Sequence, residues 1–556
     1  NPEILFAVHG YNTGLGNFAT VENQRPQGDG IKSEGVKGWY QDIRDDIAQN
    51  YDQKSKGLMM IGYRWPSEQI NGHGNDTLKS KLSYARRSLP TTLKVIVILA
   101  FATLAGLTLV SLFTPLPGTI AFGIAGVILL LLATIAISVV LTLFLLRIVG
   151  YFRDSYRANN FGVPDLVELI RQLDKAVVEA DPAADWESRP RIKLSFIGHS
   201  MGSFVVTDTV RILSDVFDDS SIGQTSLGAD KAKCPSPNIG NVFSLGRLVL
   251  VAPDIPAETI ISSRANFLSS SLRRFEETYL FSNEGDMALK LASTAANYAS
   301  FPTRTREGGY RLGNVVVRLP NPKAPPAYGI VNFDSSSGDL LDVQPRSQTT
   351  PDAGPQSVTP MAQVTTLEAS GETMMVTVSS YLKYLYTLRR TSLLDRQLEL
   401  LDANQKPIAE LFTVFDCTDY QEALPGRGPV GLLSHALGKR SLNFIDYVKL
   451  SFDFFRGKID THGGYFAEAV TGGKPAKPEA RLTKQFIYGL ACLGFQPLLA
   501  VVADCPELES QPIERRKLAL KEFSSLCQAH GIQTLLAAER YNQAILGIDE
   551  RDRTGY

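Results

Sequence analysis

A serine between two glycines is the residue whose surroundings most clearly indicate chemistry. Residues 198–202 read Gly-His-Ser-Met-Gly, after the strand-like stretch 194–197 and before a helix-compatible segment. A serine on such a strand-to-helix turn exposes its hydroxyl, and flanking glycines lack the Cβ atoms that would collide there. In a chain with 45 glycines the motif alone could arise by chance, but its place between a strand and a helix favours a catalytic turn over a chance match. We therefore predict that Ser200 is a nucleophile, framed by Gly198 and Gly202.

A second element upstream fits the same chemistry. Residues 5–12 form a strand-like run that contains His9-Gly10 at its end. Attack by a serine on a carbonyl group places negative charge on the oxygen, and two backbone N–H groups commonly stabilise that charge. The residue after the nucleophile supplies one, and the loop after an upstream strand supplies the other. These residues would be Met201 and Tyr11, with Gly10 as the alternative to Tyr11; otherwise His9-Gly10 is only a turn.

The serine needs a base, and the chain has six histidines: His9, His73, His199, His435, His462 and His530. In enzymes with this elbow the chain order is serine, acid, histidine, which leaves the last three. His462 lies in the glycine-rich loop 460–466, which can project a ring toward the strand ends. His435 lies in an apolar, helix-like segment and His530 near a helix end, both more typical of packing or surface positions. We predict that His462 is the base.

Two aspartates compete to orient the histidine. Asp286 follows the strand-like run 278–281, which is the usual position for the acid in this chain order. Asp254 follows the preceding strand-like run, where a minority of such enzymes carry the acid, and it could instead hydrogen-bond its own loop. Either carboxylate could orient an imidazole and stabilise its cation. We favour Asp286 and keep Asp254 as the alternative.

The elements that must position these residues are short strands. The strand-like runs are residues 4–8, 58–63, 192–197, 248–252 and 278–281. Helical stretches lie between them, and 163–180 has clear helical periodicity. This alternation predicts an α/β fold, with a mostly parallel sheet and helices on both faces. In such sheets ligands bind beyond the carboxyl ends of the strands, where the candidate residues lie.

Three segments interrupt the alternation. Residues 95–146 contain no charged residue, 345–363 read as a flexible linker, and the last 80 or so residues look helical. The predicted organisation is a core of residues 1–90, 150–340 and 440–475, an apolar helical hairpin at 91–149, a linker and inserted cap at 341–440, and a C-terminal helical region at 476–556.

The apolar segment has two interpretations. Residues 95–114 are long enough to span a bilayer once, and 119–146 could do so with tilt. Basic residues flank both ends, as expected for a hairpin whose ends lie on one side of a membrane. The uncharged turn 114–119 favours instead a lid over the active site that opens at a lipid surface. Both interpretations predict contact with lipid.

The composition gives no indication of a nucleic-acid-binding, disordered, zinc-binding or disulfide-rich protein. The 556 residues carry a net charge of −1, so nothing indicates a basic face for nucleic acid. A hydrophobic content of 44% and a charged content of 20% are typical of a globular chain. The five cysteines lack the spacing of a zinc site or of a dense disulfide framework, although they allow one bridge between the later ones. We expect neither a metal ion nor a cofactor.

Five motifs give a more specific indication. In chain order they read FAVHGYNTG, YRWPSE, FIGHSMGS, LVLVAPDI and FSNEGDMAL. They resemble the motifs of a bacterial α/β-hydrolase family of largely undefined function, over roughly 1–90, 150–340 and 440–470. The resemblance implies an α/β-hydrolase fold, and His462 is similar to that family's late His-x-Tyr-Phe motif with one extra glycine. The chain departs from the pattern where a long stretch separates the strand-like 328–336 from the histidine, which we interpret as the inserted cap.

The overall plan, a hydrolase core with large caps and an apolar lid, is similar to that of membrane-attacking lipases delivered by type VI secretion. We predict a lipolytic serine esterase, a lipase or phospholipase, that is associated with membranes. Its partners would be lipid and, for a toxin, an inhibitory protein in the producing cell. No cleavable secretory signal is visible, so secretion would not use one. The alternatives are a membrane-anchored peptidase or thioesterase of the same fold, and an inactive hydrolase-fold scaffold.

Overall fold

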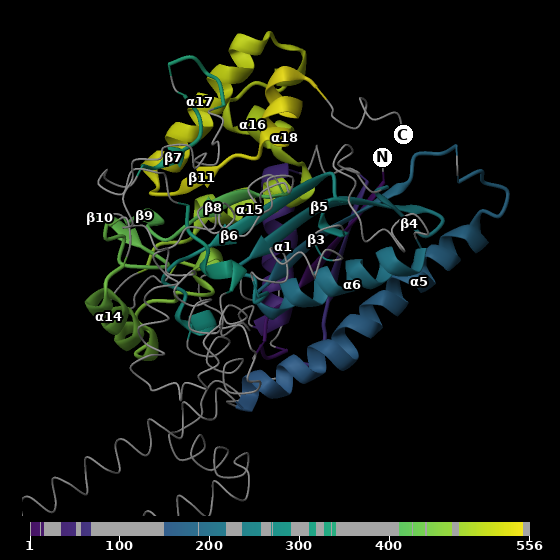
Figure 1. The fold of residues 1–556 in the computed structure, drawn as a ribbon, viewed down its shortest axis with the longest axis horizontal. Helices are drawn as coiled ribbons and strands as arrows, with labels where there is room; N and C mark the ends of the chain where they lie inside the picture. Colours follow the sequence, from purple (N-terminus) through teal and green to yellow (C-terminus); the bar gives the residue numbers. More distant parts are fainter. Residues whose placement is uncertain are drawn as a thin grey trace, which may run out of the picture.

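The structure is a computed structural model, in which the described residues surround one central sheet (Figure 1). The described residues are 2–11, 13–15, 35–51, 57–67, 149–186, 188–217, 236–256, 268, 271–290, 311–317, 327–334, 336–340, 411–424, 426–439, 442–469 and 477–548. The predicted apolar segment 95–146 and the predicted linker 345–363 lie outside these residues.

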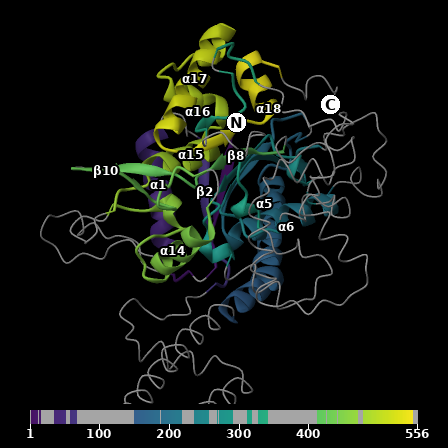
Figure 2. The same ribbon diagram turned by 60° about the vertical axis from the view of Figure 1, so that its left-hand side comes forward.

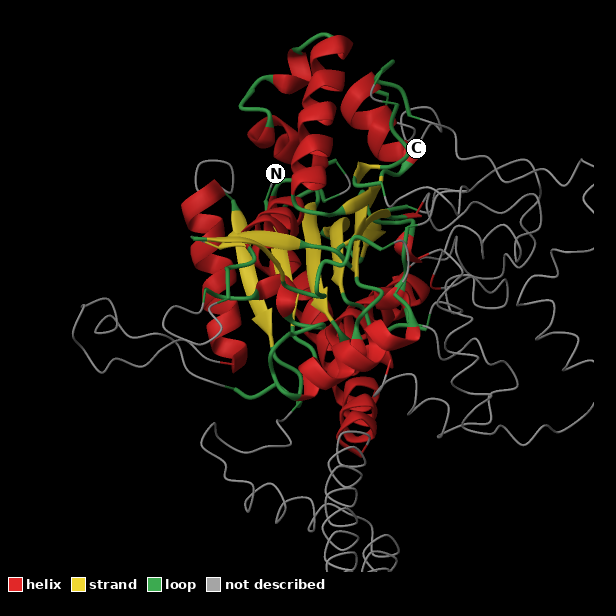
Figure 3. Cartoon of the chain, turned by 90° about the vertical axis from the view of Figure 1, so that its left-hand side faces the viewer, coloured by secondary structure: helices red, strands yellow, loops and turns green. Residues whose placement is uncertain are grey.

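A nine-stranded sheet forms the centre of the described molecule (Figure 3). Its order is β2-β1-β3-β5-β6-β8-β11-β7, and β4 pairs with β5. The first six strands in this order are parallel to one another, whereas β11 is antiparallel to β8 and parallel to β7. The prediction of a mostly parallel sheet is confirmed. The strands are β1 Glu3–Val8, β2 Leu58–Tyr63, β3 Ile192–His199, β4 Asn238–Ile239, β5 Phe243–Val251, β6 Glu277–Ser282, β7 Gly329–Ile330, β8 Thr413–Asp416 and β11 Gln533–Leu535.

Strand β1 shows how the sheet separates two apolar cores. Ile4, Phe6 and Val8 contribute to one core, and Leu5 and Ala7 to the other, because successive side chains of a strand point to opposite faces. All five are buried, since helices cover both faces (Figure 2). The first core is covered by α5 (Val163–Ala180) and α6 (Met201–Phe217), and the second by α1 (Gly35–Tyr51), α15 (Arg481–Cys492), α16 (Phe495–Val502) and α17 (Ile513–Ala529).

The predicted helix at 163–180 is confirmed as α5, with the same bounds. It continues from a short π-helical turn, η2 (Ala158–Gly162), and its buried residues Val163, Leu166 and Ile170 follow helical spacing. Asp174 is also buried on this face, and its Oδ1 accepts from the backbone N–H of Val242 at 2.9 Å. Helix α5 is therefore attached to the turn that leads into β5.

The C-terminal region belongs to the same core. On β5, Arg247 donates from Nε to the carbonyl oxygen of Ala491 at 3.0 Å and from Nη2 to that of Cys492 at 2.9 Å. Its guanidinium also pairs with Glu3 on β1. Helix α15 thus lies directly on the sheet, and β11 joins it. The boundary predicted at 475 does not separate the core from the C-terminal helices.

Strand β8 differs from the predicted organisation in a similar way. It lies between β6 and β11 in the sheet, although its residues fall in the interval 341–440 that we predicted to be linker and cap. A strand of four residues that is buried on both faces has no alternation by which to recognise it. The chain therefore returns to the sheet before the histidine loop. The next two strands along the chain after β8 are β9 (Gln421–Leu424) and β10 (Arg427–Gly431). They pair with each other in a separate antiparallel sheet.

The remaining elements are short, apart from α14 (Phe444–Phe455), which precedes the histidine loop. They are η6 (Leu312–Asn314), η7 (Gly464–Phe466), η8 (Leu508–Ser510), α18 (Ala538–Tyr541) and η9 (Asn542–Leu546). Among the described helices, none combines the length and apolar character that crossing a membrane requires. The four described cysteines are Cys417, Cys492, Cys505 and Cys527, and all are free thiols.

Candidate active site

Ser200 occupies a strained turn between β3 and α6. Its φ is 55°, in the left-handed region that residues other than glycine rarely adopt. Close packing explains the flanking glycines. A Cβ on Gly202 would lie 2.3 Å from the carbonyl oxygen of Val8, and one on Gly198 would lie 2.7 Å from Cα of Ser203. This is the backbone geometry of a nucleophile elbow.

The hydroxyl of Ser200 is enclosed. The residue is 1% exposed, and its Oγ has no hydrogen-bond partner among the described residues. An unpaired buried hydroxyl destabilises a fold, so a serine kept in this state is a candidate for chemistry.

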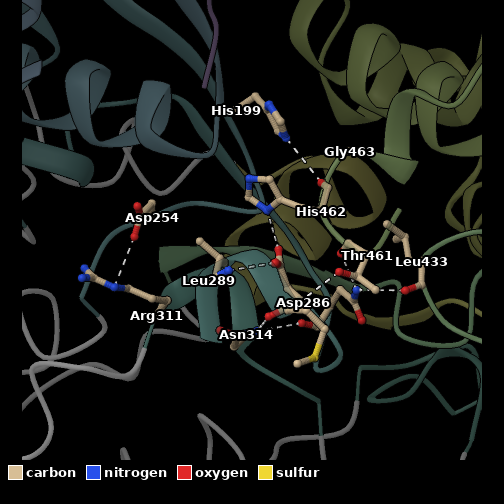
Figure 4. Close-up of polar contacts among 12 residues, drawn as sticks. His199, Asp254, Asp286, Leu289, Arg311, Asn314, Leu433, Thr461, His462 and Gly463 are labelled. Carbon is tan, nitrogen blue, oxygen red and sulfur yellow. Dashed lines mark hydrogen bonds and ion pairs between the residues drawn. The ribbon is translucent and has the colours of Figure 1, made fainter. Parts of the chain in front are cut away.

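His462 and Asp286 are hydrogen-bonded to each other, although 176 residues separate them. Nδ1 of His462 lies 2.7 Å from Oδ2 of Asp286, and Figure 4 shows the two side chains pointing toward each other. The carboxylate is fully buried, and its Oδ1 accepts from the backbone N–H of Leu289 at 3.0 Å. Nε2 of His462 has no partner within the described part of the chain. With Nδ1–H donating to the carboxylate, Nε2 carries the lone pair that can accept a proton.

Contacts around His199 bring the histidine loop to the elbow. His199 directly precedes Ser200, and its ring centroid lies 5.0 Å from that of His462. Its Nε2 also lies 3.4 Å from the carbonyl oxygen of His462. Nε2 of His462 and Oγ of Ser200 therefore belong to neighbouring segments at the carboxyl ends of β3 and β6.

Electrostatics distinguish His462 from the histidines beside it. Burial alone lowers the pKa of His462, but the charge and hydrogen bond of Asp286 outweigh it and raise this pKa above 6.5. For the carboxyl group of Asp286 the directions are reversed: burial raises its pKa, and the charge and hydrogen bond of His462 oppose that rise. Desolvation lowers the pKa of His199 to about 3 and that of His9 to about 4. Only His462 of these three is held ready to carry a positive charge near neutral pH.

Residues that the sequence analysis did not single out tie the acid loop to the histidine loop. Nδ2 of Asn283 donates to the carbonyl oxygen of Thr461 at 2.7 Å, and Oγ1 of Thr461 accepts from the N–H of Met287 at 3.1 Å. Nδ2 of Asn314 donates to the carbonyl oxygen of Asn283 at 3.1 Å. All four residues are buried, so these bonds fix the position of the acid loop relative to the histidine loop. The sequence signal for them was the place of Asn283 and Met287 within the motif FSNEGDMAL.

Asp254, the alternative acid, faces a different partner. Its Oδ1 lies 3.2 Å from Nε of Arg311, and both side chains are buried (Figure 4). Its backbone N–H donates to the carbonyl oxygen of Ser200 at 3.1 Å, which supports the elbow. The structure therefore brings Asp286, and not Asp254, into hydrogen-bond contact with His462.

The other two late histidines also have acidic partners of their own. Nε2 of His435 lies 3.1 Å from Oδ2 of Asp453, and Nδ1 of His530 lies 3.5 Å from Oε2 of Glu422. His73 lies outside the described residues. Within the described ranges, no cluster of three or more His, Cys, Asp or Glu side chains is arranged to hold a metal ion.

The residues predicted to hold an oxyanion border the elbow. A Cβ on Gly10 would lie 2.8 Å from Cβ of Ser200, so the loop after β1 runs against the nucleophile. Met201 is the first residue of α6, and N–H groups in the first turn of a helix have no acceptor within the helix. Such groups favour a negative charge.

A chain of hydrogen bonds supports the loop that carries Tyr11. Oγ1 of Thr13 donates to the carbonyl oxygens of Gly10 and Tyr11, at 2.7 and 3.2 Å. The N–H of Thr13 donates to Oγ of Ser67 at 3.4 Å, and Oγ of Ser67 donates to the buried carboxylate of Asp154 at 2.7 Å. Ser67 is the serine of the motif YRWPSE, so this motif contributes a support for the loop.

The fold and this site define the class: the chain has the α/β-hydrolase fold. Residues 155–318 match the model of a family described as "Alpha/beta hydrolase of unknown function (DUF900)". The matched stretch contains the elbow and Asp286 and ends before His462, and it covers less than a third of the chain. The predicted resemblance to an α/β-hydrolase family is confirmed there. No curated protein and no solved structure matches the chain. The match supports a hydrolase and names no substrate.

Proposed function

We propose that the protein is a lipolytic serine esterase, a lipase or phospholipase. Ser200 attacks the ester carbonyl while Nε2 of His462 takes its proton, and Asp286 orients the imidazole and stabilises its cation. The N–H groups of Met201 and of Tyr11 or Gly10 stabilise the oxyanion. As the bond to the alcohol breaks, the protonated His462 gives its proton to the departing alcohol. Water, deprotonated in turn by His462, then attacks the acyl group on Ser200 and releases the carboxylic acid, and the proton returns to Ser200. The observation that carries the proposal is the 2.7 Å bond between His462 and Asp286, with the opposite nitrogen left without a partner among the described residues beside the elbow.

The choice of lipid rests on the sequence. A segment of 52 uncharged residues, 95–146, must be covered by protein, detergent or lipid, because exposing it to water would cost more than a domain's stability. As a lid or a membrane hairpin it brings the site to a lipid surface. Peptidase or thioesterase activity uses the same side chains and is the second candidate. A role as an antibacterial effector with an inhibitory partner belongs to the same proposal.

The proposal is tested by labelling and by hydrolysis. The full chain should react with a fluorophosphonate probe and hydrolyse members of a panel of phospholipids and acylglycerols, whereas Ser200→Ala should do neither while keeping its melting temperature. An unlabelled but folded wild-type protein would identify an inactive scaffold. Labelling together with hydrolysis of peptides or thioesters, but not of any lipid, would favour the second candidate.

The pH dependence of hydrolysis should follow the raised pKa of His462. The imidazole accepts a proton only when neutral, so kcat/KM should fall as the pH drops through this pKa, with an acid limb at higher pH than an unperturbed histidine would give. The residual activity of Asp286→Asn should show an acid limb at lower pH, because the charge that raises the pKa is gone. The measurement is kcat/KM on a soluble short-chain ester, with the melting temperature recorded at each pH. Identical acid limbs for the two proteins would contradict the role of Asp286.

A further inference from the structure

Helix α14 exposes an apolar face. Its side chains Phe444, Ile445, Val448 and Phe452 are 60%, 73%, 52% and 57% exposed. Their spacing places them on one side of the helix. The opposite side is also apolar, because Leu450 is buried in a small core together with Tyr447 and Phe454. Only one side of α14 is used by the fold in the described residues, and we call the other side the α14 face.

Such a face needs a partner. Scattered exposed apolar residues are common, but large apolar side chains gathered on one surface mark a contact with protein or membrane. Elsewhere on the described surface, such residues occur singly or in pairs, such as Met59 on β2 and Ile513 with Leu518 on α17, and no other described helix exposes four of them.

The exposed charged side chains of α14 and of the three residues that follow it are basic. Lys449, Arg456 and Lys458 are exposed, and the guanidinium of Arg456 lies 4.4 Å from the centroid of the Phe452 ring. The two aspartates of the helix are buried. Asp446 caps the helix start and pairs with Lys439, and Asp453 pairs with His435 and Lys458. An apolar strip bordered by basic side chains fits the boundary between acyl chains and anionic headgroups.

Through its buried side, helix α14 packs against the candidate active site. Tyr447 donates from its hydroxyl to Oε1 of Glu284 at 3.1 Å, and Gly285 has Leu450 so close that a Cβ there would lie 3.1 Å from Cδ1 of that leucine. Both contacts are to the loop that carries Asp286. The chain then runs from the end of α14 straight into the loop of His462. In Figures 1 and 2 the helix lies far from the group α16, α17 and α18.

We propose that the α14 face docks the protein on an anionic lipid bilayer. Its four exposed apolar side chains enter the boundary of headgroups and acyl chains, while Lys449 and Arg456 contact anionic headgroups. Docking there brings the carboxyl ends of the strands to the membrane surface. This consequence for catalysis rests on the proposed lipolytic function, whereas the binding itself does not.

Binding is measured with full-length Ser200→Ala protein, which leaves the lipid intact. The probes are phosphatidylcholine vesicles with and without phosphatidylserine, separated from free protein by flotation. Ile445→Gln/Phe452→Gln should weaken binding by about tenfold or more. Lys449→Gln should weaken binding by about fivefold, only where phosphatidylserine is present. The matched control is Ile513→Gln/Leu518→Gln, two residues of α17 that are 41% and 47% exposed, which should bind as Ser200→Ala does.

The outcomes separate this proposal from the proposed function. Melting temperatures and, in the wild-type background, fluorophosphonate labelling should not change, because the substituted side chains are exposed. Unchanged binding of the α14 double variant would overturn the proposal, as would a change of oligomeric state in size-exclusion chromatography in place of lost vesicle binding. Vesicle binding that depends on α14, in a protein that hydrolyses no lipid, would uphold the docking and reject the lipolytic function.

Discussion

Ser200→Ala, His462→Ala and the variant that combines them should each lose hydrolysis to the same extent, about 10⁶-fold in kcat. The two side chains act in one proton transfer, so removing the second after the first costs little more. The measurement is kcat on a soluble ester for the three variants, against the wild-type protein. Losses that multiply in the double variant would mean that the two residues act independently.

The controls are the other late histidines. His435→Ala should lower the melting temperature, because it removes one of the two partners of Asp453, and His530→Ala should do so by loss of its contact with Glu422. Both should keep kcat within a few-fold of wild type. If His435→Ala lost as much activity as Ser200→Ala, the catalytic base would be His435, in the loop before α14, and not His462.

Asp286→Asn should lower kcat by about 10⁴-fold while leaving the fold intact. An amide at this position favours the tautomer of His462 that has its proton on Nε2, so the nitrogen facing the nucleophile can no longer accept one. Asp254→Asn should act differently. It removes the carboxylate charge that pairs with the buried guanidinium of Arg311, so the expected loss is in stability, by about 3 kcal/mol.

The two variants are compared in one pair of measurements, kcat and the free energy of unfolding in urea. The expected pattern is a catalytic loss for Asp286→Asn and a stability loss for Asp254→Asn. The reverse pattern would assign the acid to the loop after β5.

Local signals in the sequence were sufficient for the elbow and for most of the parallel strands. Gly198 and Gly202 mark a turn whose crowding is a property of the backbone, so the motif predicts it without knowledge of distant residues. The runs that became β1, β5 and β6 are continuous and apolar because helices bury both faces of a parallel sheet, and α5 shows the spacing of an amphipathic helix. The glycine-rich loop around His462 was enough to favour it as the catalytic base over His435 and His530.

Other features depend on contacts between distant segments, and only the tertiary structure decided them. Asp286 and Asp254 follow adjacent strands, and the sequence favours Asp286 by its position without excluding Asp254; the fold places Asp286 at 2.7 Å from His462 and Asp254 against Arg311. The short strands β8 and β11 carry too few residues to show a period, so their membership in the sheet depends on their partners. The bonds of Asn283 to the histidine loop, and the exposure of one side of α14 rather than the other, follow from packing across many intervening residues. Sequence periodicity reports which side chains share a face, and only tertiary packing decides which face is covered.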